Sequence, residues 1–413
     1  MTLEKSLPER VLVVAANYWP EESGSAPYTT GLAEDLAAHG SSVTVLAAMP
    51  YYPGWRIRDG YRGHLRLREE RNGVSLVRSW LWVPGHQSAL QRAALEGSFL
   101  LDALCVGQLA RPQVVIGATP TLSGGVLARL FARRFHVPYG LVAQDLVGPG
   151  ALQSGVRGGG RVAGLVRSAE SWAMRRAARI AVVSPGFIPY LRELGVQEER
   201  IEHIRNWCSI PKSAADPAEV RARLGLPKGT PIVVHAGAMG LKQGLEQVVD
   251  AARLDQERGA AWCFVLAGDG SQRRTLRQHA RDVSNVLFLP QQPVTAYADL
   301  LVAADILLVS ERPGMLNMSL PGKLTAYLAA GRPVVAAVPP DGATASEIER
   351  SGAGVLTPAG RPDLLLAALD GFAADPTSGA SLERAGPRYA ADVLDEGRCL
   401  AQYRAFVSGL LGG

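Results

Sequence analysis

Two lysines lie in glycine-rich loops, where a positively charged side chain is expected to bind an anion. Only five of the 43 basic residues are lysines, so this chain uses arginine by default. Lys242 lies in GAMGLKQGLEQ, where Gly237 follows an apolar run, and Lys323 lies in SLPGKLTAY at the start of an expected helix. Clustered backbone N–H groups beside a cation favour phosphate. The two loops predict a diphosphate site, although neither has the spacing of a Walker motif.

The groups next to Lys323 strengthen this interpretation. Pro321 and Gly322 shape a turn, and Ser319 could cap the helix and donate to a phosphate oxygen. A cation in the first turn of a helix is unfavourable unless an anion offsets it. A bound phosphate would remove that mismatch.

A further loop near the start of the chain, PEESGSAPYTT, also suits an anion. Gly24 permits close approach of the backbone to a ligand, Ser25 is a candidate N-cap, and Pro27 fits the first helical turn. A helix start with ordinary capping and no ligand is the competing interpretation.

Candidates for acid or base chemistry are few. Asp145 in VAQDL follows an expected strand, so it is either a side chain that projects toward the site or an N-cap of the next segment. The sequence has no D-x-D pair to hold a metal-bound diphosphate, and no HExxH-like or Ser-His-Asp pattern. We therefore expect no metal and no cofactor, with positive charge from Lys242 and Lys323 in place of the metal.

The segment of residues 51–71 alternates aromatic residues with arginines. Tyr51, Tyr52 and Trp55 are candidates to stack on an acceptor, because aromatic faces bind sugars and guanidinium groups bind phosphates. A solvated loop without a ligand is the alternative. Nucleic acid is not expected as a partner, since the rest of the chain supplies no basic stripe.

Composition bounds the fold and the location. The 413 residues suit two domains, and 47% hydrophobic with 20% charged residues is typical of globular proteins. No apolar run is long enough for a membrane span, and the N-terminus lacks the core of a signal peptide. We expect a cytoplasmic protein with reduced, buried cysteines. Its net charge of +5 is compatible with peripheral contact with the inner face of a membrane.

Apolar runs of strand length alternate with helical patterns, and the alternation starts twice. The first series begins at residues 11–16 and continues through residues 114–119, 139–144 and 180–184; the second begins at residues 232–237. Continuous apolar strands and intervening helices predict doubly wound α/β domains. We place the domains at residues 1–206 and 207–390, with residues 391–413 as a C-terminal helix that crosses back to the first domain.

These motifs together resemble the family-four glycosyltransferases of the GT-B fold, in the branch of the colanic-acid-type enzymes. The likeness is carried by NYWPEESGSAPYTTGLAEDL, VAQDL, HAGAMGLKQGLE, LAGDG and SLPGKLTAYLAAGRPVV, and covers nearly the full length. It implies two Rossmann-like domains that face each other across a cleft, with the acceptor on the first domain and the nucleotide-sugar donor on the second.

The resemblance also implies roles for particular residues. The diphosphate would be held by Lys242, Lys323 and the residues near Gly322, and the donor sugar would lie beside Asp145. The predicted donor site is completed by Gly237, Gly268, Ser319 and Pro321. The other domain would contribute Gly24 and Ser25. The family's Glu-x7-Glu pair falls at Met318 and Ala326, so this chain lacks both glutamates. An arginine common in the family is replaced by Ala238.

The resulting expectation is a metal-independent, retaining transferase. It would move a sugar from a UDP or GDP sugar to a glycan, a lipid-linked acceptor or a small molecule. The alternatives are a sugar-nucleotide-binding protein that has lost the chemistry, which the missing glutamates favour, and a GT-B-like sugar-nucleotide epimerase. An epimerase would need additional carboxylates and histidines in the cleft.

Overall fold

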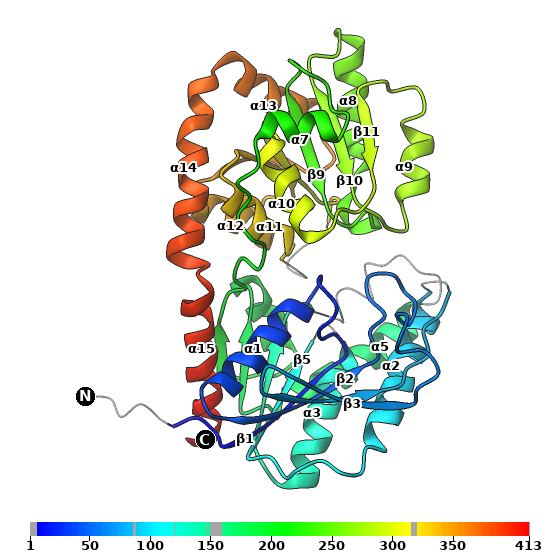
Figure 1. Ribbon diagram of the computed structural model, residues 1–413, viewed down its shortest axis with the longest axis vertical. Coiled ribbons are helices and arrows are strands. Elements are labelled where there is room, and N and C mark those ends of the chain that lie inside the picture. Colours follow the sequence, from blue (N-terminus) through cyan, green and yellow to red (C-terminus); the bar gives the residue numbers. More distant parts are fainter. Residues whose placement is uncertain are drawn as a thin grey trace, which may run out of the picture. The chain divides into compact units, whose positions relative to one another are not determined.

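A computed structural model describes residues 6–85, 88–119, 121–146, 148, 159–314 and 320–412. The chain divides into two compact units (Figure 1). Residues 1–206 and 396–413 form the first, and residues 207–395 form the second. The boundary expected at residue 390 lies inside a helix, α14 (Pro376–Val393), and the chain leaves the second unit after Asp395.

The first unit is built on an eight-stranded sheet in the order β3-β4-β2-β1-β5-β6-β7-β8. All of its strand pairs are parallel except β3 with β4. The strands are β1 (Arg10–Ala15), β2 (Ser42–Ala48), β3 (Arg66–Arg71), β4 (Val74–Ser79), β5 (Val114–Ala118), β6 (Tyr139–Ala143), β7 (Arg179–Val182) and β8 (Ile201–His203).

The helices of the first unit follow the strands in the expected alternation. They are α1 (Ala26–Ala38), α2 (Ala89–Leu104), α3 (Leu122–Phe135), α5 (Gly159–Met174), α6 (Ile188–Glu193) and the terminal α15 (Glu396–Gly409).

The second unit is a six-stranded sheet, in which every strand pair is parallel, in the order β11-β10-β9-β12-β13-β14. Hydrophobic clusters cover both faces, which explains why its central strands are continuous apolar runs. The strands are β9 (Ile232–Ala236), β10 (Cys263–Ala267), β11 (Val286–Leu289), β12 (Ile306–Ser310), β13 (Val334–Val338) and β14 (Gly354–Pro358).

The helices of the second unit lie between these strands and after the last of them. They are α7 (Pro217–Arg223), α8 (Glu246–Glu257), α9 (Arg273–His279), α10 (Val294–Ala303), α11 (Lys323–Ala330), α12 (Ala343–Ser351), α13 (Pro362–Ala374) and α14.

The fold differs from the sequence-based expectation at the edge of the first sheet. The arginine-rich part of residues 51–71, for which a solvated loop was the alternative to an acceptor-binding segment, ends in the strand β3. Its residues RLREER alternate between exposed and half-buried, a charged pattern typical of an edge strand that must not pair with other chains. Cys105 is also exposed, against the expectation of buried thiols, because it ends α2 at the surface.

The terminal helix α15 packs within the first unit. Arg404 donates two hydrogen bonds to the Asp35 carboxylate of α1, at 2.7 and 2.8 Å. A Cβ atom at Gly140 in β6 would lie 2.9 Å from Cζ of the buried Phe406, so the ring occupies the space left by the glycine. Residues far apart in the sequence thus share one core. Among the described helices, none is long and apolar enough to cross a membrane.

We predict that Phe406→Ala destabilises the first unit by about 3–5 kcal/mol, because it leaves a cavity against β6. Chemical denaturation followed by circular dichroism measures this. Leu101→Ala is the control: Leu101 is 67% exposed, so its loss should change stability by less than about 0.5 kcal/mol. Equal effects of the two changes would mean that α15 is not docked on this core.

Candidate functional site

The order in which successive strands join the second sheet reverses between β9 and β12, while all strands stay parallel. The strands β10 and β11 continue from β9 on one side, and β13 and β14 continue from β12 on the other. β9 pairs with β12 only at Val233 and Val234, so the two strands part toward their carboxyl ends. Open α/β sheets bind ligands at such a switch point.

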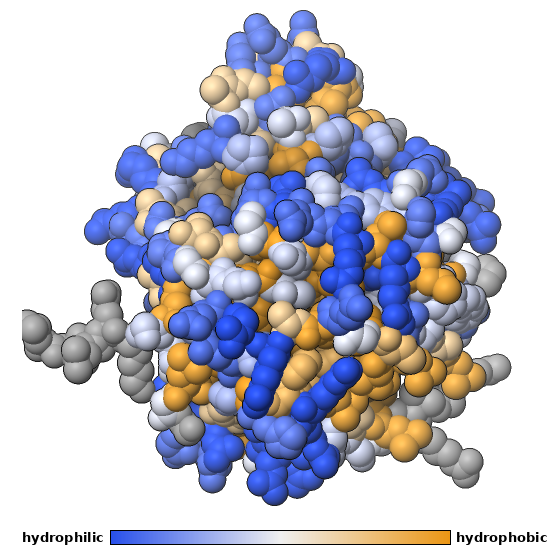
Figure 2. All heavy atoms as spheres, turned by 60° about the horizontal axis from the view of Figure 1, so that its bottom comes forward, coloured by the Kyte–Doolittle hydropathy of each residue, from blue (hydrophilic) through white to orange (hydrophobic). Residues whose placement is uncertain are grey.

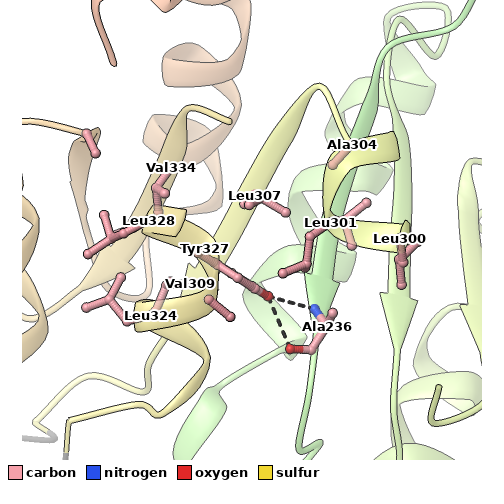
Figure 3. Close-up of a cluster of buried hydrophobic side chains, with 14 of the residues drawn as sticks. Ala236, Leu300, Leu301, Ala304, Leu307, Val309, Leu324, Tyr327, Leu328 and Val334 are labelled. Carbon is pink, nitrogen blue, oxygen red and sulfur yellow. Dashed lines mark hydrogen bonds between the residues drawn. The ribbon is translucent and has the colours of Figure 1, made fainter. Parts of the chain in front are cut away.

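Tyr327 of α11 fills the opening between the parted strands (Figure 3). The Ala236 N–H donates to the Tyr327 hydroxyl at 2.8 Å, and this hydroxyl donates to the Ala236 carbonyl at 3.2 Å. The tyrosine is fully buried, and burial raises its pKa. Both backbone groups that β12 leaves unpaired are therefore satisfied, and α11 is fixed to the end of β9.

This attachment places the first residue of α11, Lys323, at the switch point. Its Nζ lies 3.1 Å from Nε2 and 3.5 Å from Nδ1 of His235 in β9. The aliphatic stem passes over Gly237, where a Cβ atom would lie 3.3 Å from Lys323 Cε. Burial lowers the pKa of Lys323 to about 7, and the nearby Glu311 opposes the shift. The ammonium is thus poorly solvated and needs an anion.

His235 is completely buried and uncharged. Burial, and then the charge of Lys323, hold the pKa of the imidazole well below its usual value. Its ring nitrogens face the backbone carbonyls of Ala238 and Leu308 as well as the lysine. Sequence analysis did not single out this residue, although a histidine inside the apolar run IVVHAG was a visible signal.

Glu311, directly after β12, was also missed. Its carboxylate accepts a hydrogen bond from the Thr344 hydroxyl at 2.5 Å. Burial raises the pKa of Glu311, while the Thr344 hydrogen bond and the charges of Lys323 and Lys242 lower it. The site therefore combines two cations with one half-buried carboxylate, and its excess charge is positive.

The loop that carries Lys242 is fastened to the loop after β12. The Arg312 N–H donates to the Lys242 carbonyl at 2.9 Å, and the Ser310 hydroxyl donates to the Gln243 carbonyl at 2.7 Å. Gly244 has φ 51°, and a Cβ atom there would lie 2.9 Å from the Arg312 Cα. Lys242 itself is exposed. It lies in a 3₁₀ turn of residues 241–243 before α8, not at the first turn of α8.

The predicted glycines meet at the same sheet edge. Gly268 crosses the backbone of Gly237 so closely that a Cβ atom would overlap the Gly237 carbonyl oxygen. Gly322 precedes α11 without a side-chain cap, and the Leu324 N–H donates to the Pro321 carbonyl at 2.9 Å. Ser319 lies outside the described residues.

The acceptor candidates of the first unit surround a buried carboxylate that sequence analysis missed. Glu21 Oε1 accepts hydrogen bonds from the backbone N–H groups of Tyr51 and Tyr52, at 2.8 and 2.7 Å. Burial raises the pKa of Glu21. Gly24, with φ 69°, abuts Tyr52: a Cβ atom would lie 3.2 Å from the ring. The turn after β2 is thereby held against the loop after β1.

Trp55 lies next to both tyrosines. Its ring centroid is 5.7 Å from that of Tyr51 and 6.0 Å from that of Tyr52, and the Arg92 guanidinium lies 5.4 Å from its centroid. Tyr51 is buried, so it supports the other two rings instead of offering a surface. The half-buried Asp145 is close enough to Tyr52 to raise the pKa of its hydroxyl, after the larger effect of burial.

The remaining predictions for the first unit have mixed outcomes. Ser25 precedes α1, but its side chain caps nothing; its carbonyl accepts from the Thr29 N–H at 3.0 Å. Several arginines of residues 51–71 are held by the protein itself, among them Arg62 with Asp59 and Arg71 with Glu34. In the part of the chain that the structure describes, no group of three or more His, Cys, Asp or Glu side chains could hold a metal ion.

The comparisons with protein families match both units. Residues 23–207 match a glycosyl transferase 4-like domain, and residues 230–375 match the glycosyl transferases group 1. The chain is 33% identical over 334 residues to the "Putative colanic acid biosynthesis glycosyl transferase WcaI" of Escherichia coli, covering 78% of this chain and 81% of the relative. It is 28% identical to the 2-deoxystreptamine glucosyltransferase of Streptomyces kanamyceticus, over 42% of this chain and 46% of that protein.

Solved structures match the fold over almost all of the chain. Sucrose-phosphate synthase from Thermosynechococcus elongatus superposes with a TM-score of 0.72 at 18% identity, covering 95% of this chain and 97% of that one. Anabaena HepE in complex with UDP-glucose gives a TM-score of 0.68 at 18% identity, with 95% and 98% covered. The match supports the expected pair of doubly wound domains. The chain thus belongs to the family-four glycosyltransferases of the GT-B fold, in the colanic-acid-type branch, and is an enzyme that transfers sugars.

Proposed function

We propose that this enzyme takes its sugar from a UDP-sugar whose diphosphate binds at the switch point between β9 and β12. The observation that carries the proposal is the poorly solvated Lys323 ammonium at the N-terminal end of α11. Lys242 supplies a second cation, and the N-terminus of α11 offers backbone N–H groups and the positive end of its dipole. The UDP-glucose in HepE supports the choice of base.

The chemistry asked of this site is stabilisation of a leaving group. As the bond from the anomeric carbon to the diphosphate oxygen breaks, negative charge builds on the diphosphate, and the acceptor oxygen forms the new bond and loses its proton. Fixed cations in a dry site stabilise that charge more than water does. Retention of anomeric configuration is inferred from the family resemblance.

We assign the acceptor to the first unit. Tyr52 and Trp55, with Arg92 beside them, form an aromatic and cationic surface that suits a sugar ring. Asp145 could accept a proton from an acceptor hydroxyl or orient the donor sugar. The relatives of this chain favour a glycan or a small-molecule acceptor. The roles of Gly24, Ser25 and Ser319 at the donor rest on the resemblance alone.

Peripheral membrane contact is a further element of the proposal. Leu90, Leu101 and Leu104 are exposed on one face of α2. Trp82 lies beside this helix, and its backbone N–H donates a hydrogen bond to the Ser98 hydroxyl oxygen. The Arg66 guanidinium lies 3.7 Å from the Asp102 carboxylate. We call Leu90, Leu101, Leu104 and Trp82 the α2 face. Figure 2 shows that hydrophobic residues also lie exposed in patches among hydrophilic ones on the face that it presents.

We predict that Lys323→Ala lowers turnover about tenfold or more, because it removes a charge that acts on the leaving diphosphate. Release of UDP in the presence of acceptor is the measurement. Lys228→Ala is the matched control, since Lys228 is exposed and precedes β9 at the opposite edge of the sheet. Unchanged kinetics of the Lys323 variant at saturating donor and acceptor would remove this residue from the mechanism.

We predict that turnover survives excess EDTA, because the two lysines take the place of a metal at the diphosphate. Rates are compared before and after chelation, with magnesium and manganese added back. If chelation abolished activity and a metal ion restored it, the assignment of the diphosphate to the lysines alone would be wrong.

We predict that the enzyme sediments with vesicles of anionic phospholipid and that Leu101→Glu with Leu104→Glu releases it, because carboxylates on the α2 face oppose insertion and are repelled. Leu364→Glu, at a half-exposed leucine of the second unit, should leave binding unchanged. Vesicle binding that is equal in both variants would exclude the α2 face as the contact.

A further inference from the structure

The imidazole of His235 is a polar group in a core position. It lies near the end of β9, between β10 and β12, and is fully buried. Burying a polar ring costs free energy unless its donor and acceptor are both satisfied. The proposed function gives this side chain no part, so its presence needs an explanation.

The imidazole of His235 needs one hydrogen-bond acceptor and one hydrogen-bond donor. A neutral imidazole has one N–H and one lone pair. The Leu308 carbonyl can take only the N–H, and the Ala238 carbonyl lies 3.4 Å from Nε2, farther than the 3.1 Å between Nε2 and Lys323 Nζ. We therefore place the N–H on Nδ1 and the lone pair on Nε2. The lone pair requires a donor, and the Lys323 ammonium has three N–H groups and no acceptor. Its Nζ, 3.1 Å from Nε2, is the group that fills this position.

We infer that His235 is a positioning residue whose neutral imidazole accepts a hydrogen bond from Lys323 Nζ, aims the ammonium at the donor phosphate and keeps it charged for binding. This inference rests on the proposed function of Lys323. Residues of α11 and of the loop after β9 support the same position of the Lys323 ammonium. Tyr327 fixes α11 to Ala236, and Gly237 leaves room for the lysine stem.

The charged groups near Lys323 determine how the affinity for a diphosphate should depend on pH. Glu311, after β12, favours the charged ammonium, and Lys242, before α8, belongs to the same cluster because it acts on Glu311. Burial nevertheless lowers the pKa of Lys323 to about 7. Only the charged form attracts a diphosphate, so affinity should be highest at low pH and weaken by up to about tenfold per pH unit as pH rises above this pKa.

The test is the dissociation constant of UDP, measured by calorimetry between about pH 6.5 and pH 9. His235→Leu removes the hydrogen-bond acceptor from the half-buried Lys323. A hydrogen bond to the charged form of a group favours that form. We expect about tenfold weaker binding at pH 7.5, with the decline in affinity displaced to lower pH. Comparison with the unchanged enzyme cancels the titration of UDP itself. A merely structural role would not displace the profile.

Two polar variants test the inference even if His235→Leu fails to fold. In the His235→Gln variant, the side-chain amide reaches the position of the histidine Nε2. In the His235→Asn variant, the shorter side-chain amide reaches only the position of Nδ1. The glutamine variant should bind within about threefold of the unchanged enzyme and keep its pH profile, and the asparagine variant should not. Equal affinity and one common profile for these two variants, or an unchanged profile for His235→Leu, would overturn the inference.

The controls separate this inference from the proposed function. Asn285→Leu removes buried hydrogen bonds to the Ala252 and Trp262 carbonyls in the same unit, and should lower stability without changing UDP affinity or its pH profile. If Lys323→Ala binds UDP as well as the unchanged enzyme does, the proposed function fails. If Lys323→Ala loses binding while His235→Leu keeps both affinity and profile, only the role of His235 fails.

Discussion

The candidate site of the second unit depends on one constraint, which is the partial burial of a lysine ammonium where two parallel strands part. An ammonium in that position loses hydration, and a histidine nitrogen and a nearby carboxylate compensate in part. The compensation is incomplete, because the pKa of Lys323 still falls to about 7. A bound diphosphate would complete this compensation, so the poor solvation of the Lys323 ammonium favours an anionic ligand.

The neighbouring residues hold the Lys323 ammonium in place. Tyr327 uses the two backbone groups freed by the parting of β9 from β12, and so the helix that carries the lysine is tied to the strand that carries the histidine. The loop of Lys242 is tied in turn to Arg312. Gly268 is required because its backbone crosses that of Gly237 too closely for a Cβ atom, and Gly237 leaves room for the aliphatic part of the Lys323 side chain.

The sequence allowed much of this fold to be predicted, for a physical reason. Strands covered on both faces are continuous apolar runs, so β1, β5, β6, β7 and β9 were recognisable from hydrophobicity alone. The strand β3 was missed because its residues RLREER bury no continuous face. The scarcity of lysine and its place beside glycines indicated Lys242 and Lys323. His235, Glu311 and Glu21 were not predicted, since their importance comes from burial and from neighbours distant in sequence.

The central claim is that the nucleoside diphosphate lies between the ends of β9 and β12. A crystal structure of the enzyme with UDP tests it most directly. We expect a phosphate oxygen within about 3 Å of Lys323 Nζ, next to the N-terminal end of α11, with His235 still bonded to the same ammonium. A diphosphate bound elsewhere, with Lys323 turned away from it toward Glu311, would contradict the account.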